Sequence, residues 1–213
     1  MNIVQNILFH LLKIKKGITI KILLPFEYII TWLILYANKA SFTTFKSHGI
    51  PLINVSKGGS FQIGRDFRMN NRESSNPIGR FRHCSVVVGN RGKLVIGKCV
   101  GMSSTSIVCY DSITIDDCAQ IGGNVVIYDT DFHSLNFKNR LKKDTDLLGR
   151  KNKSIHIGKN VFIGAHSTIL KGVKIGDNSV VGACSVVTKS IPPNQIWAGN
   201  PIKFIRDLPE NEN

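Results

Sequence analysis

The stretch from Ile157 to Val187 repeats every six residues. Its large aliphatic residues follow one another at this spacing without a slip: Ile157, Ile163, Ile169, Ile175, Val181 and Val187. A period of six is neither the 3.6 of an α-helix nor the alternation of a simple strand. It predicts short strands joined by tight corners, with one aliphatic side chain pointing inward per unit. Three units make a three-sided coil of about 18 residues, and each coil buries its aliphatic residues only against neighbouring coils.

Residues between the aliphatic positions suit the corners of such coils. Asn160 and Asn178 occupy equivalent slots, and asparagine tolerates the positive φ that a corner can require. Three of the five cysteines, Cys99, Cys118 and Cys184, share the fourth slot of a unit, which indicates a tolerated corner rather than chemistry. The cysteines form no C-x-x-C pair, so neither a zinc ribbon nor a thioredoxin-type site is indicated. An odd cysteine count without a clear export signal fits a reducing cytoplasm.

The repeat also covers the middle of the chain. Units begin at Ile63, Ile96, Met102 and Val108, slip by one residue, and continue at Ile115, Ile121 and Ile127. An irregular segment with Pro77 separates Asn70 from Asn90, so we expect a loop or an imperfect coil there. These units predict one repeat domain over residues 41–190.

The register breaks at His133, where an aliphatic residue is due, and returns only at Ile157. We therefore expect the chain to leave the stack near His133 and to form an excursion loop over residues 134–154. The loop is basic, with seven Lys and Arg residues between Lys138 and Lys153 against Asp144 and Asp146. A long loop inside a compact repeat domain is more often functional than accidental.

The two ends of the chain differ from the repeat. Residues 1–40 predict one or two amphipathic helices that are basic on one side, and their apolar runs are poor for a bilayer-spanning helix. They either pack on the protein or a neighbouring subunit, or lie on an anionic membrane surface. The basic residues are Lys13, Lys15, Lys16 and Lys21.

Residues 191–213 form a tail after the last strand. In this tail Asn200 and Pro201 predict the start of a short helix, in which Lys203 and Arg206 share one face.

Composition narrows the choice of partner only slightly. The chain has 213 residues and a net charge of +14, which favours nucleic acid, lipid headgroups or a phosphorylated cofactor. No phosphate-binding glycine loop, nucleophile elbow or paired catalytic carboxylates stand out. Nucleic acid is disfavoured because no aromatic residues are interleaved with the basic loop.

His133 is the strongest candidate for chemistry, because it stands where regular structure gives way to an exposed loop. Imidazole titrates near neutrality and can take a proton from an attacking hydroxyl. By contrast, His156 is expected to face outward and His166 to lie in a corner. A zinc site of three histidines fits poorly, since His156 and His166 are ten residues apart and His133 is out of register.

Three segments together resemble the hexapeptide-repeat acyltransferases, above all the maltose and galactoside O-acetyltransferases and those of capsular and other surface polysaccharides. The segments are Asp129 to Ser134, Ile157 to Lys189, and Ile191 to Pro201, and the resemblance covers roughly Ser41 to Leu208. It implies an all-β fold, a left-handed parallel β-helix, which is an exception to the usual crossover hand. It also implies a homotrimer with active sites between neighbouring prisms.

The implied reaction is acetyl transfer from acetyl-CoA to a sugar hydroxyl, with His133 as the general base and no metal. Phe162, where many relatives have Trp, belongs to the expected CoA site, and cations there would meet CoA phosphates. The full expected set is Phe162, Ala165, Ala183, Thr188, Lys189, Lys203 and Arg206. On the acceptor side the resemblance points to Asp131, Ser103 and Ser104, but an Asn common in sugar-specific relatives has no clean equivalent. The acceptor therefore stays open.

The expected function is O-acetylation of a surface polysaccharide or its precursor by a cytoplasmic enzyme. That enzyme would sit at the inner face of the membrane if residues 1–40 bind lipid. Acetylation of a small acceptor (serine, a free sugar or an antibiotic) is the alternative within the enzyme class. A basic repeat scaffold without catalytic activity is the alternative outside it.

Overall fold

The computed structural model describes residues 2–73, 76, 78 and 82–209. Pro77, expected in an irregular segment, lies outside the described residues. So do the side chains of Lys15 and Lys16, two of the four lysines expected on the basic side of the N-terminal helix.

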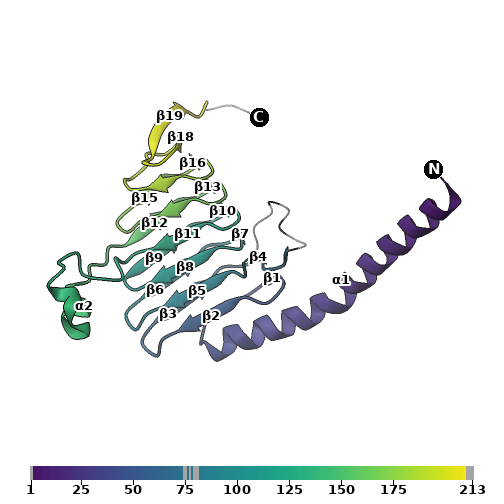
Figure 1. Cartoon of the computed structure of the whole chain (residues 1–213), viewed down its shortest axis with the longest axis horizontal. Coiled ribbons are helices and arrows are strands. Elements are labelled where there is room, and N and C mark those ends of the chain that lie inside the picture. Colours follow the sequence, from purple (N-terminus) through teal and green to yellow (C-terminus); the bar gives the residue numbers. More distant parts are fainter. Residues whose placement is uncertain (1, 74–75, 77, 79–81, 210–213) are drawn as a thin grey trace.

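Three sheets of parallel strands form the three walls of a tapering prism (Figure 1). The first wall contains β1 (Phe45–His48), β4 (Phe67–Asn70), β7 (Gly101–Ser103), β10 (Gln120–Ile121), β13 (Phe162–Ile163), β16 (Val180–Val181) and β18 (Gln195–Ala198). The second contains β2 (Leu52–Val55), β5 (Ser85–Val88), β8 (Ser106–Cys109), β11 (Val126–Tyr128), β14 (Thr168–Ile169) and β17 (Val186–Val187). The third contains β3 (Ser60–Ile63), β6 (Lys93–Ile96), β9 (Ser112–Ile115), β12 (Ile155–Ile157) and β15 (Lys174–Ile175). Successive strands go to successive walls, so three strands make one coil.

The inward positions of the upper coils agree with the six-residue spacing. Ile157, Ile163, Ile169, Ile175, Val181 and Val187 are all buried. The expected corners have positive φ, at 56° for Asn160 and 62° for Asn178. Cys99, Cys118 and Cys184 also have positive φ, between 57° and 63°, which confirms that their shared slot is a corner. Stacked aliphatic residues therefore form the core.

The lower coils have longer strands, which changes which residues point inward. Strand β8 has four residues, and alternation along it buries Ile107 and Cys109 while Val108 faces outward. The expectation that Val108 is an inward residue of the six-residue series is therefore wrong. Two inward residues per strand replace the single one of the upper coils.

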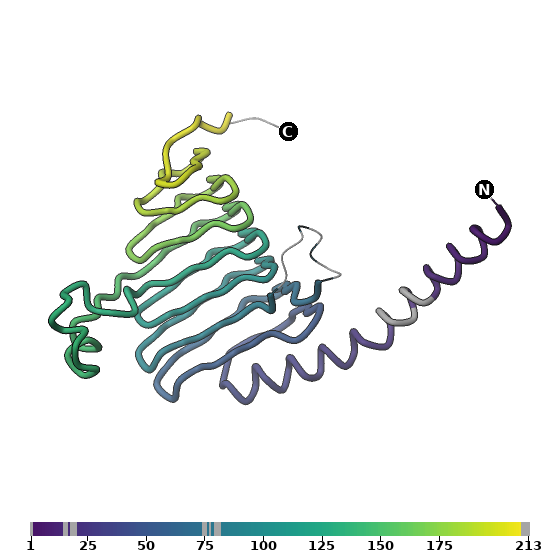
Figure 2. The backbone as a smooth tube through the Cα atoms, in the orientation of Figure 1, coloured from purple at the N-terminus to yellow at the C-terminus, as the bar shows by residue number. Residues whose placement is uncertain are grey.

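The described part of the chain leaves the prism between β11 and β12. This segment runs from Asp129 to Ser154 and contains η2 (Asn139–Leu141) and α2 (Lys143–Gly149). It projects from the edge of the prism opposite the first wall (Figure 2). We refer to residues 129–154 as the excursion.

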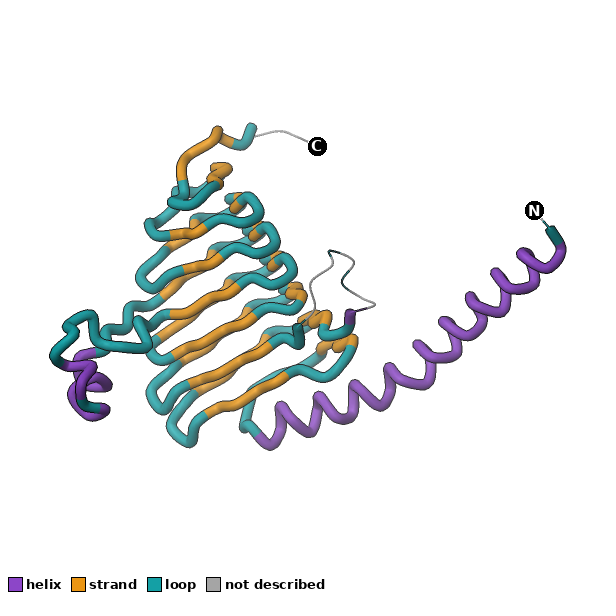
Figure 3. The backbone as a smooth tube through the Cα atoms, viewed as in Figure 1, coloured by secondary structure: helices purple, strands orange, loops and turns teal. Residues whose placement is uncertain are grey.

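The N-terminal segment is one helix, α1 (Ile3–Ala37), rather than two. Asn2 and Gln5 form a capping box at its start. Its C-terminal half packs on the first coil: Glu27 accepts the Gly49 N–H at 2.8 Å, Leu35 is fully buried, and Tyr28 stacks on Phe45. The N-terminal half extends away from the prism (Figure 3). None of the helices in the described part has both the length and the apolarity to cross a membrane.

The C-terminal tail contains no helix at Pro201. The chain turns at Gly199, whose φ is +104°, and β19 (Lys203–Asp207) pairs antiparallel with β18. The short C-terminal helix expected from Asn200 and Pro201 is therefore wrong, because backbone pairing with β18 replaces local helical bonding. Lys203 and Arg206 nevertheless share a face, because a bulge in β19 pairs them with Ala198 and Ile196, which stand two apart on β18.

Candidate active site

His133 lies in the excursion with one ring nitrogen fixed and the other side of the ring open. Its Nδ1 is 2.6 Å from Oδ2 of Asp146, and 70% of the side chain is exposed. An ionised carboxylate only accepts hydrogen bonds, so Nδ1 carries the proton. In the neutral ring Nε2 then bears the lone pair and can accept a proton from a bound molecule.

Asp146, on α2, holds this arrangement in place. Its second oxygen accepts the backbone N–H of Ser134 at 2.7 Å, so one carboxylate fixes both the ring and the adjacent backbone. The hydrogen bond from His133 and then that from Ser134 hold the pKa of Asp146 below its ordinary value. The sequence showed Asp146 only as one charge in a basic loop, because thirteen residues separate it from His133 and no repeat relates the two.

The excursion is tied to the prism at its root. Asp129 is buried and accepts the backbone N–H groups of Tyr110 and Asp111 at 2.7 and 2.8 Å. Burial raises the pKa of Asp129, and these two hydrogen bonds oppose the rise. Arg140 closes the loop internally by donating to the Ser134 carbonyl at 2.6 Å. Hydrogen bonds on both sides of His133 therefore hold the segment that carries it.

Asp131, expected on the acceptor side, forms an ion pair with Lys171 of the next coil at 2.9 Å. Its side chain is only 17% exposed. In this structure Asp131 thus binds the excursion to the coil above it.

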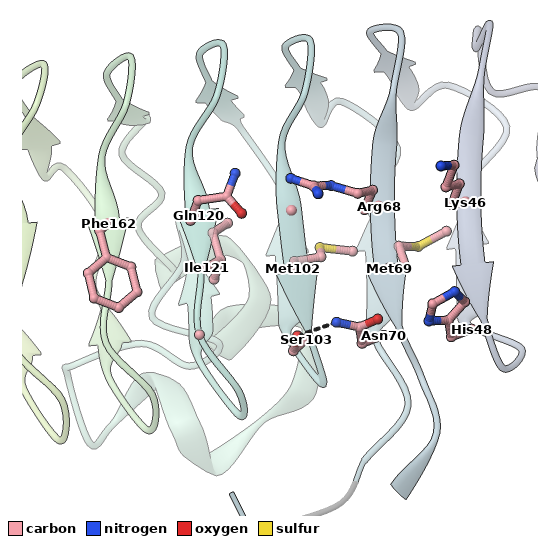
Figure 4. A pocket seen from close by; sticks show the side chains of 12 residues that line it. Lys46, His48, Arg68, Met69, Asn70, Met102, Ser103, Gln120, Ile121 and Phe162 are labelled. Carbon is pink, nitrogen blue, oxygen red and sulfur yellow. Dashed lines mark hydrogen bonds between the residues drawn. The ribbon is translucent and has the colours of Figure 1, made fainter. Parts of the chain in front are cut away.

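A cavity of about 400 Å³ lies on the outer face of the first wall (Figure 4). Two residues expected at the site line it together: Phe162 from the donor side and Ser103 from the acceptor side. Ser103 accepts a hydrogen bond from Asn70 at 2.9 Å. Ser104 does not belong to the lining, because its side chain is buried and accepts from Asn76.

Strand pairing places the cavity residues in one outward row, one residue per strand. Lys46 pairs with Arg68, Arg68 with Gly101, Gly101 with Gln120, and Gln120 with Phe162. We call these five residues the outward row. Gly101, at the centre of this row, has no side chain and is buried, because the side-chain amide of Gln120 occupies the space above it. A Cβ at Gly101 would lie 2.6 Å from Oε1 of Gln120.

The other residues expected to bind the cofactor are distributed along the upper coils. Ala165 and Ala183 lie at the same corner of successive coils, and the Ala165 carbonyl accepts the Cys184 N–H at 2.8 Å. Thr188 and Lys189 follow β17 and are exposed, and Lys189 Nζ lies 5.1 Å from the Trp197 ring centroid. Lys203 and Arg206 are exposed on β19.

One chain does not bring His133 to the cavity. The excursion projects from one side of the prism and the first wall faces the other (Figure 1). His156 and His166 are engaged elsewhere, with Asp116 at 2.8 Å and Asn124 at 3.1 Å. Among the described residues, no group of three or more His, Cys, Asp or Glu side chains is placed to hold a metal ion.

Fold and sequence define the class as a hexapeptide-repeat left-handed β-helix. Residues 154–189 match the model of the bacterial transferase hexapeptide family (six repeats). The resemblance to hexapeptide-repeat acyltransferases is confirmed by individual relatives. The galactoside O-acetyltransferase of Escherichia coli K12 is 42% identical over 101 residues, which cover 47% of each chain.

Two solved structures extend the likeness to most of the prism. A galactoside acetyltransferase in complex with coenzyme A has a TM-score of 0.52 and 31% identity, covering 80% of this chain and 66% of that one. The hexapeptide-repeat acetyltransferase VCA0836 of Vibrio cholerae, complexed with acetyl-CoA, has a TM-score of 0.53 and 25% identity, covering 79% and 72%. The first curated relatives are matched over 36% of their own length.

Proposed function

We propose that this protein is an acetyl-CoA-dependent O-acetyltransferase that modifies a sugar hydroxyl. The observation that carries the proposal is the His133 ring, whose Nδ1 is held by Asp146 and whose Nε2 side is open. The named relatives that act on galactosides, or that were crystallised with coenzyme A, support the donor and the sugar acceptor.

In the proposed reaction His133 acts as a general base. A sugar hydroxyl is a far weaker acid than imidazolium, so Nε2 takes the proton as the oxygen attacks the thioester carbonyl, not before. The C–O bond forms, the tetrahedral intermediate collapses, and the C–S bond breaks. The imidazolium returns its proton to the departing CoA sulfur, and Asp146 keeps the ring oriented throughout. No acyl-enzyme is required.

For the donor we propose a path along the upper coils to the cavity. Phe162 would contact the pantetheine arm, Ala165 and Ala183 would offer backbone groups to its amides, and Thr188 would line the same path. Three exposed cations would bind the CoA phosphates, because charge-assisted bonds suit phosphate oxygens. They are Lys189, Lys203 and Arg206.

We also propose that the active site forms between copies in a homotrimer. His133 and the cavity face different sides of one prism, so a neighbouring copy has to bring its excursion to the first wall. A symmetric ring repeats this contact three times. Mixing the variants His133→Ala and Gly101→Trp would test the proposal. About a quarter of the sites in randomly mixed trimers would combine two intact halves and regain activity. If trimers shown to contain both variants regained no activity, the whole active site would have to lie within one chain.

The acceptor is proposed to be a surface polysaccharide or its lipid-linked precursor, reached at an anionic membrane surface through residues 1–40. On α1 exposed apolar side chains lie on the side that faces away from the prism and, in the N-terminal half, on the other sides as well. They include Val4, Leu8, Leu11, Ile22, Phe26, Ile29 and Leu33. No acidic residue precedes Glu27, whereas four lysines do. Such a helix suits anionic lipid. Equal sedimentation of the full chain with neutral and anionic vesicles would contradict this.

The function is tested by thiol release from acetyl-CoA with methyl galactoside and with an oligosaccharide panel. Acetyl-CoA should raise the melting temperature, because ligand that binds only the folded state stabilises it. The proposed function would be refuted if acetyl-CoA gave no thermal shift and no acceptor gave thiol release.

A further inference from the structure

The outward row on the first wall contains two cations that are neighbours in the strand ladder. Lys46 on β1 pairs in register with Arg68 on β4, and both side chains are exposed. Adjacent strands lie about 4.8 Å apart, so two positive side chains stand side by side. Like charges placed opposite one another across strands destabilise a sheet.

In the described part of the molecule no ion pair includes Lys46 or Arg68. The carboxylate of Asp66, which lines a neighbouring cavity together with both cations, accepts a hydrogen bond from Thr44 at 3.2 Å. Among the described residues that line the cavity in Figure 4 none is acidic, while His48, Asn70, Ser103 and Gln120 add further polar groups. Lys46 and Arg68, two cations without an ion-pair partner at the edge of a cavity with polar lining, are suited to bind an anion.

The position of these cations separates them from the donor's phosphates. Four inter-strand steps, roughly 19 Å, lie between Lys46 and Phe162 in the outward row. The cations proposed for the CoA phosphates lie on the side of Phe162 that faces away from Lys46. Lys203 and Arg206 are on β19, and Lys189 follows β17. The two cationic groups thus stand toward opposite ends of the prism, and the cavity lies between Phe162 and the Lys46–Arg68 pair.

We propose that the acceptor is an anionic sugar, whose carboxylate or phosphate group is bound by Lys46 and Arg68 in the cavity on the first wall. This inference rests on the proposed function, because it assigns the cavity to the acceptor. The sugar ring lies in this cavity beside the Gln120 amide that covers Gly101, and Ser103 and Asn70 face it from the next outward position. A neutral sugar fills the same cavity but leaves the two cations without a counter-charge.

The experiment measures equilibrium binding of three probes to the full chain by ligand-observed NMR: methyl glucoside, methyl glucuronide and glucose 6-phosphate. The variants are Arg68→Gln and Gly101→Ala, with Arg65→Gln as the control. Arg65 is an exposed arginine three residues away that does not line the cavity. Both charged probes, or one of them, should bind about tenfold more tightly than methyl glucoside, since charge-assisted hydrogen bonds are about twice as strong as neutral ones. The preferred probe identifies carboxylate or phosphate as the source of the charge.

Arg68→Gln should remove about tenfold of that preference, and Arg65→Gln should keep it. Gly101→Ala should weaken all three probes, because the added Cβ displaces the Gln120 amide from above Gly101 into the cavity. Acetyl-CoA binding, measured by thermal shift, should be the same in all variants.

Equal binding of charged and neutral probes, no binding of any probe, or a preference unchanged by Arg68→Gln would overturn the inference. Loss of acetyl-CoA binding in Arg68→Gln would assign the cations to the donor instead and would also overturn it. These failures are distinct from a failure of the proposed function, in which wild-type protein neither binds acetyl-CoA nor releases thiol.

Discussion

Two histidines of this protein pair with an aspartate, one in the excursion and one on the regular wall. His133 uses Nδ1 to bind Asp146 at 2.6 Å, which leaves Nε2, the nitrogen farther from the backbone, available. His156 on β12 uses Nε2 to bind Asp116 at 2.8 Å, which leaves only Nδ1, close to the backbone. The same two residue types therefore form a candidate base in one region and a surface contact between coils in the other.

The difference comes from backbone geometry. On the wall, coils lie one strand spacing apart, and a side chain on one coil reaches its partner on the adjacent coil with its far end. In the excursion the chain folds back, so that α2 brings Asp146 to the near side of the ring. The fold-back of the excursion is what places a carboxylate there in this protein.

The largest expected effect is the loss of the excursion histidine. A positioned general base contributes about 10²- to 10⁴-fold to a rate, so His133→Ala should lower kcat by that factor. His156→Ala should stay within about twofold, since that ring has no open Nε2. Thiol release under saturating acetyl-CoA measures both. Comparable losses in the two variants would show that the two histidines do not differ in their part in the reaction.

Next comes the carboxylate that orients the ring. Asp146→Asn offers an amide in place of an acceptor-only group, and kcat should fall about 10- to 100-fold, short of the loss in His133→Ala. KM for acetyl-CoA should change little.

Because the pKa of Asp146 is lowered, its contribution to folding is fully present above its unfolded pKa, about 4, and is lost as pH falls through the lower folded value. Amide exchange at Ser134 should report that loss, and protection that persists in Asp146→Asn would contradict it.

A smaller effect is expected at the tie between Asp131 and the prism. Lys171→Met leaves a largely covered carboxylate without its cation, which should cost on the order of 1–2 kcal/mol of unfolding free energy. Activity should fall about threefold as the base becomes less well positioned. Chemical denaturation and kcat measure the two, with Lys174→Met, on the wall, as a matched control. A loss as large as that of His133→Ala would give Asp131 a direct part in catalysis.

The smallest effect belongs to the surface contact between coils. Asp116→Asn removes an exposed pair, with side chains 31% and 48% exposed, and should change the unfolding free energy by less than about 1 kcal/mol. Activity should be unchanged, as seen by thiol release. A tenfold loss of kcat would show that the wall histidine also serves the reaction.

The parts of the structure set by repetition were predictable from sequence, and the parts set by tertiary folding were not. Ile157 to Val187 identified the coils because each unit makes the same contacts as the next. Val108 was misassigned, since the six-residue count does not report strand length, and four-residue strands bury two positions. The helix expected at Pro201 lost to pairing with β18, a contact that local propensity does not contain.

The candidate site shows the same division. His133 was recognisable because it breaks the register, and its role as a base stays a prediction. Asp146 could not be recognised, since its partnership depends on how residues 129–154 fold back. The outward row could not be read either, because register between coils separates Lys46 from Phe162 by 116 residues of sequence.

Gly101 has a wider consequence for how such a wall can change its specificity. Each strand adds one outward side chain to the row, and the spacing between neighbouring side chains is fixed at about 4.8 Å. Moving a positive charge from one strand to the next would select a ligand whose negative charge lies one strand spacing nearer or farther. Such a protein can acquire a new acceptor by single substitutions on a backbone that never has to move.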